Sequence, residues 1–235
     1  GIPGLEPVQF SIVTHRGCFG GCSFCSLGMH QGKFIQNRSP QSIAEEAAGV
    51  AAHPDFKGTI PDVGGPSANM YGLQGRRGNV CHACKRTSCV FPQVCNNLDT
   101  DHSPSVKLWR RLRSIKGIKH IFVASGIRYD LVLNDKSGRY LRDLCQYHVG
   151  GQLKIAPEHV ADRVTHLMHK PANSEYKRFI DQFKQVNRKL QKEQYLVPYF
   201  ISAHPGCDLA ANVELAEFIR DQLQYYPEQV QNFTP

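Results

Sequence analysis

The amino-acid sequence predicts an α/β fold, and more specifically a partial, TIM-like (β/α)6 barrel. Six short segments rich in β-branched and aromatic residues alternate with segments of helical periodicity along the 235 residues. Such alternation is typical of parallel βαβ units with right-handed crossovers. The length is one at which α/β barrels commonly form a single domain. We therefore expect residues 1–235 to form one domain, with a cysteine-rich insertion at residues 66–104.

The first part of the chain contains two of the expected strands and one helix. Residues 8–13 predict the first strand, and residues 39–53 predict a helix with Ser42 as its N-cap. Residues 57–63 predict the second strand, which ends at the pair Gly64–Gly65. Glycines at the end of a strand allow a ligand to approach the backbone closely.

The part that follows the insertion contains the other four strands. The strands are expected at residues 120–124, 152–156, 195–202 and 230–233. The helices are expected at residues 106–116, 137–147, 174–194 and 209–225.

Polar or reactive residues follow the expected strands. Cys18 follows the first strand, Ser125 and Arg128 follow the third, and Glu158 follows the fourth. In parallel α/β barrels the active site is built from the loops after the strand C-termini. These residues are therefore expected to share one site.

The loop after the first strand contains three cysteines, Cys18, Cys22 and Cys25, with glycines that allow it to curl. Thiolates bind soft metals, above all zinc and iron–sulfur clusters. A closed zinc site or an electron-carrying cluster needs four ligands, and this loop supplies three. A 4Fe-4S cluster held by three cysteines leaves one iron free for a substrate. The alternatives are a zinc knuckle and a chance grouping of cysteines.

The motif Cys18-x3-Cys22-x2-Cys25, with its aromatic Phe24 and its place after a strand, resembles that of the radical S-adenosylmethionine (SAM) enzymes. The chain resembles the catalytic domain of YgiQ-type radical SAM proteins, and the resemblance covers nearly every residue. Residues 11–22 and 154–159 are among the segments that carry it. It implies the partial six-stranded barrel, a 4Fe-4S cluster and bound SAM. The implied reaction is reductive cleavage of SAM to a 5′-deoxyadenosyl radical that abstracts hydrogen from a substrate. An electron donor such as flavodoxin or ferredoxin is implied with it.

The expected SAM site consists of the two glycines that the resemblance implies and of residues inferred from their chemistry and their place in the chain. These are strand-end residues and the aromatic residue of the loop: Phe24, Gly64, Gly65, Ser125, Arg128 and Glu158. The two glycines correspond to a backbone element that holds the methionine amino group, although Pro66 stands where the family has an acidic residue. The alternatives are packing for Phe24, an ion pair with Asp130 for Arg128, and helix capping for Glu158.

The insertion contains four further cysteines, Cys81, Cys84, Cys89 and Cys95, in a segment that is rich in Gly, Asn and Pro. Four thiols can hold zinc or a second iron–sulfur cluster, and metal binding would supply folding energy that the sparse apolar content lacks. The presence of one Cys-x2-Cys arm weakens the case for zinc. The alternative is free thiols in a loop.

Composition bears on location and partners. The odd number of cysteines, nine, favours metal ligation in a reducing compartment over a disulfide framework, and no apolar run has the length of a membrane helix. We therefore expect a cytoplasmic protein without a membrane segment. A net charge of +8 is compatible with nucleic acid as a partner, as is the basic face of the helix at residues 106–116. Because the chain does not begin with methionine, we expect it to be part of a longer protein.

Two other functions fit the same residues. One is an RNA-modifying, methylthiotransferase-like enzyme that uses the second cysteine set for an auxiliary cluster. The other is a nucleic-acid-binding module without enzymatic activity, in which the metal holds the fold together. Iron content after anaerobic reconstitution distinguishes them, because zinc alone would favour the binding module.

Overall fold

The computed structural model describes residues 4–5 and 8–234, and they form a mixed α/β fold of small sheets without a closed barrel. The strands are β1 (Ile12–Val13), β2 (His15–Arg16), β3 (Gln36–Asn37), β4 (Thr59–Ile60), β5 (Val63–Gly64), β6 (His120–Ile121), β7 (Gln152–Glu158), β8 (Tyr195–Ser202) and β9 (Val230–Asn232). β2 and β3 pair antiparallel, and the other ladders are parallel.

The parallel segments follow one another in chain order. β1 pairs with β5, β4 pairs with β6, and β8 lies between β7 and β9. A parallel bridge between Ile127 and Ile155 joins the segment after β6 to β7. β4 and β5 are two parts of the expected second strand, so all six expected strand segments are present. Their C-terminal ends consequently lie on the same side of the molecule.

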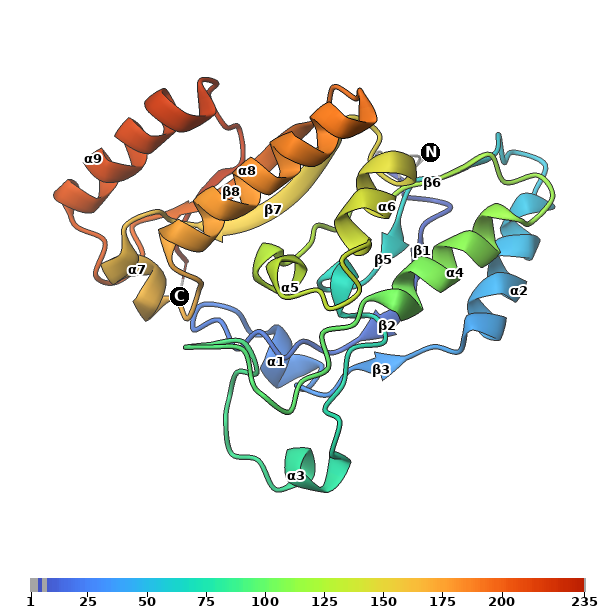
Figure 1. The fold of residues 1–235 in the computed structure, drawn as a ribbon, viewed down its shortest axis with the longest axis horizontal. Helices are drawn as coiled ribbons and strands as arrows, with labels where there is room; N and C mark the ends of the chain where they lie inside the picture. Colours follow the sequence, from blue (N-terminus) through green and yellow to red (C-terminus); the bar gives the residue numbers. More distant parts are fainter. Residues whose placement is uncertain (1–3, 6–7, 235) are drawn as a thin grey trace.

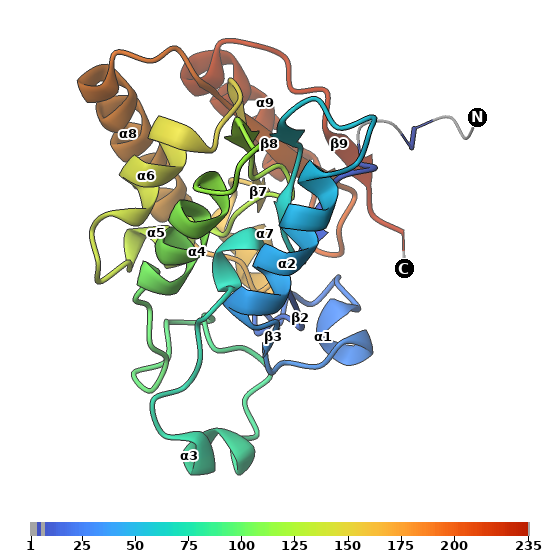
Figure 2. The same cartoon turned by 90° about the vertical axis from the view of Figure 1, so that its right-hand side faces the viewer.

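Most of the described helices form a layer over these strands, and one lies apart at the tip of the insertion (Figure 1). They are α1 (Leu27–His30), α2 (Pro40–Ala51), α3 (Gly78–His82), α4 (Ser103–Arg113), α5 (Tyr129–Leu133), α6 (Tyr140–Tyr147), α7 (Asp162–Leu167), α8 (Asn173–Leu190) and α9 (Leu209–Phe218), with the 3-10 helix η1 (Ala68–Met70) and the π-helix η2 (Ile219–Leu223). α2 packs on α4, α4 on α6 and α6 on α8 (Figures 1 and 2). The main apolar core lies between this layer and the strands.

The observed elements differ from the expected ones mainly at their ends. Residues 8–11 make local turns, so that the first strand is confined to β1. The N-cap of α2 is Ser39 and not Ser42, because the Ser39 hydroxyl accepts a hydrogen bond from the Ser42 N–H and Pro40 begins the helix. α4 likewise begins earlier than expected, with Pro104 in its first turn.

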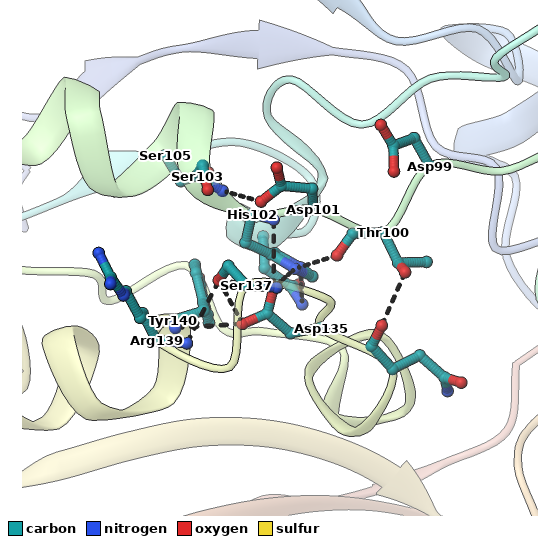
Figure 3. A network of polar contacts seen from close by, with 12 residues as sticks. Asp99, Thr100, Asp101, His102, Ser103, Ser105, Asp135, Ser137, Arg139 and Tyr140 are labelled. Carbon is teal, nitrogen blue, oxygen red and sulfur yellow. Dashed lines mark hydrogen bonds and ion pairs between the residues drawn. The ribbon is translucent and has the colours of Figure 1, made fainter.

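The insertion at residues 66–104 extends away from the strands and returns to them. Figure 1 shows it at the bottom, with α3 at its tip. Its return is held by a polar network in which His102 Nδ1 lies 3.1 Å from Asp135 Oδ1 (Figure 3). Asp135 also accepts hydrogen bonds from the Ser137 hydroxyl and the Tyr140 N–H. This network joins the end of the insertion to the turn between α5 and α6.

Replacing Asp135 by Asn is expected to lower the free energy of unfolding by about 2 to 3 kcal/mol at pH 7, since hydrogen bonds to a buried charge are lost. Burial alone would raise the pKa of Asp135, but the hydrogen bonds from His102 and Ser137 lower it well below its usual range. A carboxyl group whose pKa is lower in the folded state than in the unfolded state stabilises the fold at pH values above its unfolded-state pKa. This stabilisation is lost as the pH falls towards the folded-state pKa. The difference between wild type and Asp135→Asn in urea unfolding should therefore shrink below about pH 4. A difference that is constant with pH would contradict this assignment.

Candidate functional site

A cavity of about 420 Å³ lies at the C-terminal ends of the parallel segments. Seven residues expected from the sequence line it: Cys18, Cys22, Phe24, Cys25, Ser125, Arg128 and Glu158. They come from the loop that follows β2, from the segment between β6 and α5, and from the last residue of β7. The fold therefore brings together residues that are up to 140 positions apart, from Cys18 to Glu158.

The cysteine loop is held by its own backbone. The Cys18 N–H donates to the Gly32 carbonyl at 3.0 Å, and the Cys25 N–H donates to the Cys22 carbonyl at 3.2 Å. Gly20 is required by space, because a Cβ atom there would lie 2.7 Å from the Nη1 atom of Arg128. Its N–H also donates to Cys18 Sγ at 3.4 Å. The loop thus directs its thiols to the cavity and leaves room for the guanidinium.

Arg128 forms a buried ion pair with Asp130. The Nη2 atom lies 2.6 Å from Asp130 Oδ2, and the two side chains are 9% and 4% exposed. The Nη1 atom is directed elsewhere, to Cys22 Sγ at 3.5 Å. Asn69, at the start of the insertion, accepts from the Arg128 N–H and donates to its carbonyl. The ion pair that was the alternative role of Arg128 is therefore present, and the same side chain also contacts the cysteine loop.

Glu158 faces Lys170 across the wall of the cavity. The Lys170 Nζ atom lies 3.7 Å from Glu158 Oε1, and the two side chains are 6% and 11% exposed. Burial raises the pKa of Glu158, an effect that Lys170 and Arg128 oppose. Glu158 has a positive φ of 67°, which is strained for a residue with a side chain. Strained, buried charges of this kind are common at functional sites.

Phe24 and Ser125 line the cavity with further neighbours. The Phe24 ring packs edge-on against the His204 ring, with a centroid distance of 6.2 Å. The Ser125 hydroxyl donates to Asp62, whose other oxygen accepts from the Ala124 N–H at 2.7 Å. Each residue therefore has a packing or hydrogen-bonding role as well as a place at the cavity.

Gly64 and Gly65 do not line the cavity, although Pro66 and Ser67, which follow them, do. A Cβ atom on Gly64 would collide with Ser125, and one on Gly65 would lie 2.6 Å from the His15 ring. In this structure the two glycines allow neighbouring segments to approach each other closely. The backbone turn at Pro66 is the part of this region that reaches the site.

The residues around this cavity can be compared with what a cluster bound by three cysteine thiolates requires. The three thiols share the wall of one cavity with Arg128, Lys154 and Lys170, whose positive charges favour a bound anionic group. Burial raises the pKa of Cys18, while the Gly20 N–H and Arg128 act in the opposite direction. Within the described residues, no three His, Cys, Asp or Glu side chains converge on a single ion. The shared cavity wall and its positive charges are the features that fit a thiolate-bound group.

Several residues of this site were missed in the sequence. Lys170 and Tyr199 line the cavity, and the Asn69 amide donates a hydrogen bond to the Arg128 carbonyl. Lys170 lies in the same connection after the fourth expected strand as Glu158, and that position was a usable signal. Asn69 lies in an irregular segment that has no periodic pattern, so nothing in the sequence marked it.

The second cysteine set lies around a separate cavity of about 210 Å³, which Cys81, Cys84, Cys89 and Cys95 all line. This cavity is formed within the insertion and by the segment before β3. The four cysteines therefore line one cavity, in a place distinct from the first cavity.

The basic face of α4 is occupied by local contacts. Arg110 pairs with Asp143, the Arg111 guanidinium donates to Gln41, and the Arg113 guanidinium lies 3.9 Å from the centroid of the Tyr147 ring. These contacts favour the solvated helix face over a nucleic-acid surface. None of the helices in the described part of the chain combines the length and the apolar character that a membrane crossing requires.

Comparison with known proteins gives relatives that cover this whole chain. UPF0313 proteins from Methanocella arvoryzae, Methanosarcina acetivorans and Clostridium botulinum are 49%, 51% and 47% identical to it over 234, 234 and 235 residues. No family model matches the chain. The match covers 100% of this chain in each case, and 39%, 31% and 36% of the three relatives. The chain is thus similar along its full length to the UPF0313 proteins and spans less than two fifths of their length.

Proposed function

We propose that this chain is the catalytic part of a radical SAM enzyme, in which Cys18, Cys22 and Cys25 hold a 4Fe-4S cluster. One observation carries the proposal. The three thiols of the motif and the residues that follow β6 and β7 line one cavity. When bound, the cluster supplies the electron that cleaves SAM to a 5′-deoxyadenosyl radical, which abstracts hydrogen from a substrate.

The arrangement of the strands supports the fold that this function needs. Six parallel segments in chain order, with helices packed successively over them, form the pattern of a partial (β/α)6 barrel of the radical SAM type. We infer that this barrel is open between β9 and β1. Its cavity would then be reached from the side as well as from the strand ends.

Each group at the cavity has a defined task in this proposal. Arg128 has two nitrogens on Asp130 and its Nη1 atom near Cys22, so it holds a fixed positive charge beside a cluster ligand. Ser125 and Glu158 offer an oxygen each to the ribose or the sulfonium of SAM, and the turn at Pro66 receives the methionine end. Phe24, Ile155 and Tyr199 form an apolar wall that excludes water from a reactive intermediate.

Partners and location follow from the same proposal. An electron donor such as flavodoxin or ferredoxin would reduce the cluster, and a reducing cytoplasm would keep its ligands as thiols. Seven of the nine cysteines fall in the two sets that line the cavities, a grouping that supports metal ligation in a reducing location.

Anaerobic reconstitution with iron and sulfide, followed by dithionite and SAM, tests the proposal. We expect broad visible absorption and the release of 5′-deoxyadenosine, measured by chromatography. A reconstituted protein that binds iron but releases no 5′-deoxyadenosine would contradict it.

Replacing Glu158 by Gln is expected to weaken SAM binding roughly tenfold to a hundredfold, the effect of losing a charged hydrogen bond worth about 1.5 to 3 kcal/mol. Isothermal titration with SAM on the reconstituted protein measures the change. Glu175→Gln is the matched control, because Glu175 is a partly buried carboxylate that lines a neighbouring cavity but not this one. Equal SAM affinity in both variants would remove Glu158 from the cofactor site.

A further inference from the structure

The four cysteines of the insertion face a common space. Cys81, Cys84, Cys89 and Cys95 line the cavity of about 210 Å³, which is larger than the space of one ion. The Asn97 amide donates to Cys81 Sγ at 3.1 Å, and the Cys95 N–H donates to the Cys89 carbonyl at 2.8 Å. Gly75 is required here, because any Cβ atom would collide with Cys81 Sγ. The surrounding chain thus contacts the Cys81 thiol and ties the backbone of Cys95 to that of Cys89.

The insertion has little else to hold it together. Its apolar cluster is small and consists of Phe19, Met70, Leu73, Val90, Leu98 and Leu131. α3 is short and has no buried residue. In such a segment, metal ligation is a source of folding free energy that apolar packing does not supply.

The insertion rests directly on the first cysteine loop. The Ser88 hydroxyl donates to the Gly20 carbonyl at 2.7 Å, and the Cys89 N–H donates to the Phe19 carbonyl at 2.9 Å. Lys33, which follows the loop, donates to the Cys84 carbonyl at 2.7 Å. Cys18, Cys89 and Cys95 also pack against the same apolar cluster. The two cysteine sets are therefore parts of one connected unit.

We propose that Cys81, Cys84, Cys89 and Cys95 hold a second iron–sulfur cluster, and that this cluster supports the loop of Cys18, Cys22 and Cys25 through the segment 84–89. Spacings of two and four residues between cysteines both occur in iron–sulfur proteins. Structural zinc sites usually use two short-spaced pairs of ligands, and this segment contains one such pair.

The assignment of the second cluster is independent of the proposed function. The inference that this cluster supports the first cysteine loop rests on the proposed function, because it assumes that the first loop holds a cluster. Two contacts transmit the support. Ser88 lies between the first loop and the insertion, since its hydroxyl also accepts from the N–H groups of Val90 and Phe91. Gly21 is in close contact with the same segment, because a Cβ atom there would lie 2.7 Å from the Thr87 carbonyl oxygen.

The second site is tested in a chain whose first set is removed by Cys18→Ser, Cys22→Ser and Cys25→Ser. After reconstitution with iron and sulfide, this variant should keep about four irons per chain and broad visible absorption. Adding Cys84→Ser and Cys89→Ser should remove both, while adding Cys207→Ser, the control outside both sets, should not. An absence of iron, or one zinc per chain in place of iron, would overturn the assignment.

The support of the first loop is tested with all cysteines present. Ser88→Ala should make the first cluster lose iron to a chelator about fivefold faster, a change that corresponds to about 1 kcal/mol, the net value of one hydrogen bond. Ser114→Ala, a hydroxyl on the far end of α4 that donates to Arg111, is the control. Lys33→Met provides a second variant that leaves every thiol and Ser88 intact. Iron loss at the wild-type rate in both Ser88→Ala and Lys33→Met would refute the support and leave the second site standing.

Discussion

Replacing Cys22 by Ala is expected to reduce the release of 5′-deoxyadenosine from SAM to background. The loop supplies three ligands, so its cluster has no thiolate to spare, and Cys22 is also the thiol next to Arg128. The iron content should fall by about four per chain, and the second cluster should account for the iron that remains. Product release is measured after anaerobic reduction with dithionite.

Cys207→Ala is the matched control for this experiment. Cys207 is a partly buried thiol that lies 3.4 Å from His159 and lines neither cysteine cavity. Its variant should cleave SAM at the wild-type rate. If Cys22→Ala still released 5′-deoxyadenosine while its fold was intact by circular dichroism, the loop would not be the cluster site.

Replacing Arg128 by Met is expected to lower the free energy of unfolding by about 3 to 5 kcal/mol, because it leaves the buried carboxylate of Asp130 without its partner. The same variant should weaken SAM binding, since the positive charge beside Cys22 is lost. The double variant Arg128→Met, Asp130→Asn should regain much of the stability, because no buried charge remains unpaired, but should not regain SAM binding. Urea unfolding and SAM titration separate the two effects.

Arg163→Met is the control for the stability effect. Arg163 pairs with Asp208 and Glu214, but its side chain is 46% exposed, and an exposed ion pair that water screens contributes little to stability. If Arg128→Met were no less stable than Arg163→Met, the ion pair with Asp130 would not be the structural support of this site.

Much of the strand order and of the site wall follows from the sequence alone. The order of parallel segments follows from alternating periodicity, and the common location of Cys18, Ser125, Arg128 and Glu158 follows because the ends of parallel strands meet on one side. These predictions depend on patterns that involve only residues close together in the sequence. The grouping of the four insertion cysteines around one cavity was also predictable, since they are close together in the chain.

The partners of the site residues were decided only by the tertiary structure. The sequence offered Asp130 as an alternative ion-pair partner for Arg128. It did not indicate that the pair is buried, or that Asn69, 59 positions away, donates a hydrogen bond to the Arg128 carbonyl. Lys170 beside Glu158, and Ser88 beside Gly20, depend on how irregular segments return to the strands. Such segments carry no period that fixes their path, so their contacts are set by packing and by the hydrogen bonds that buried groups require. The sequence by itself thus determined which strand ends form the cavity, and the tertiary structure decided which charges and which second loop hold it in place.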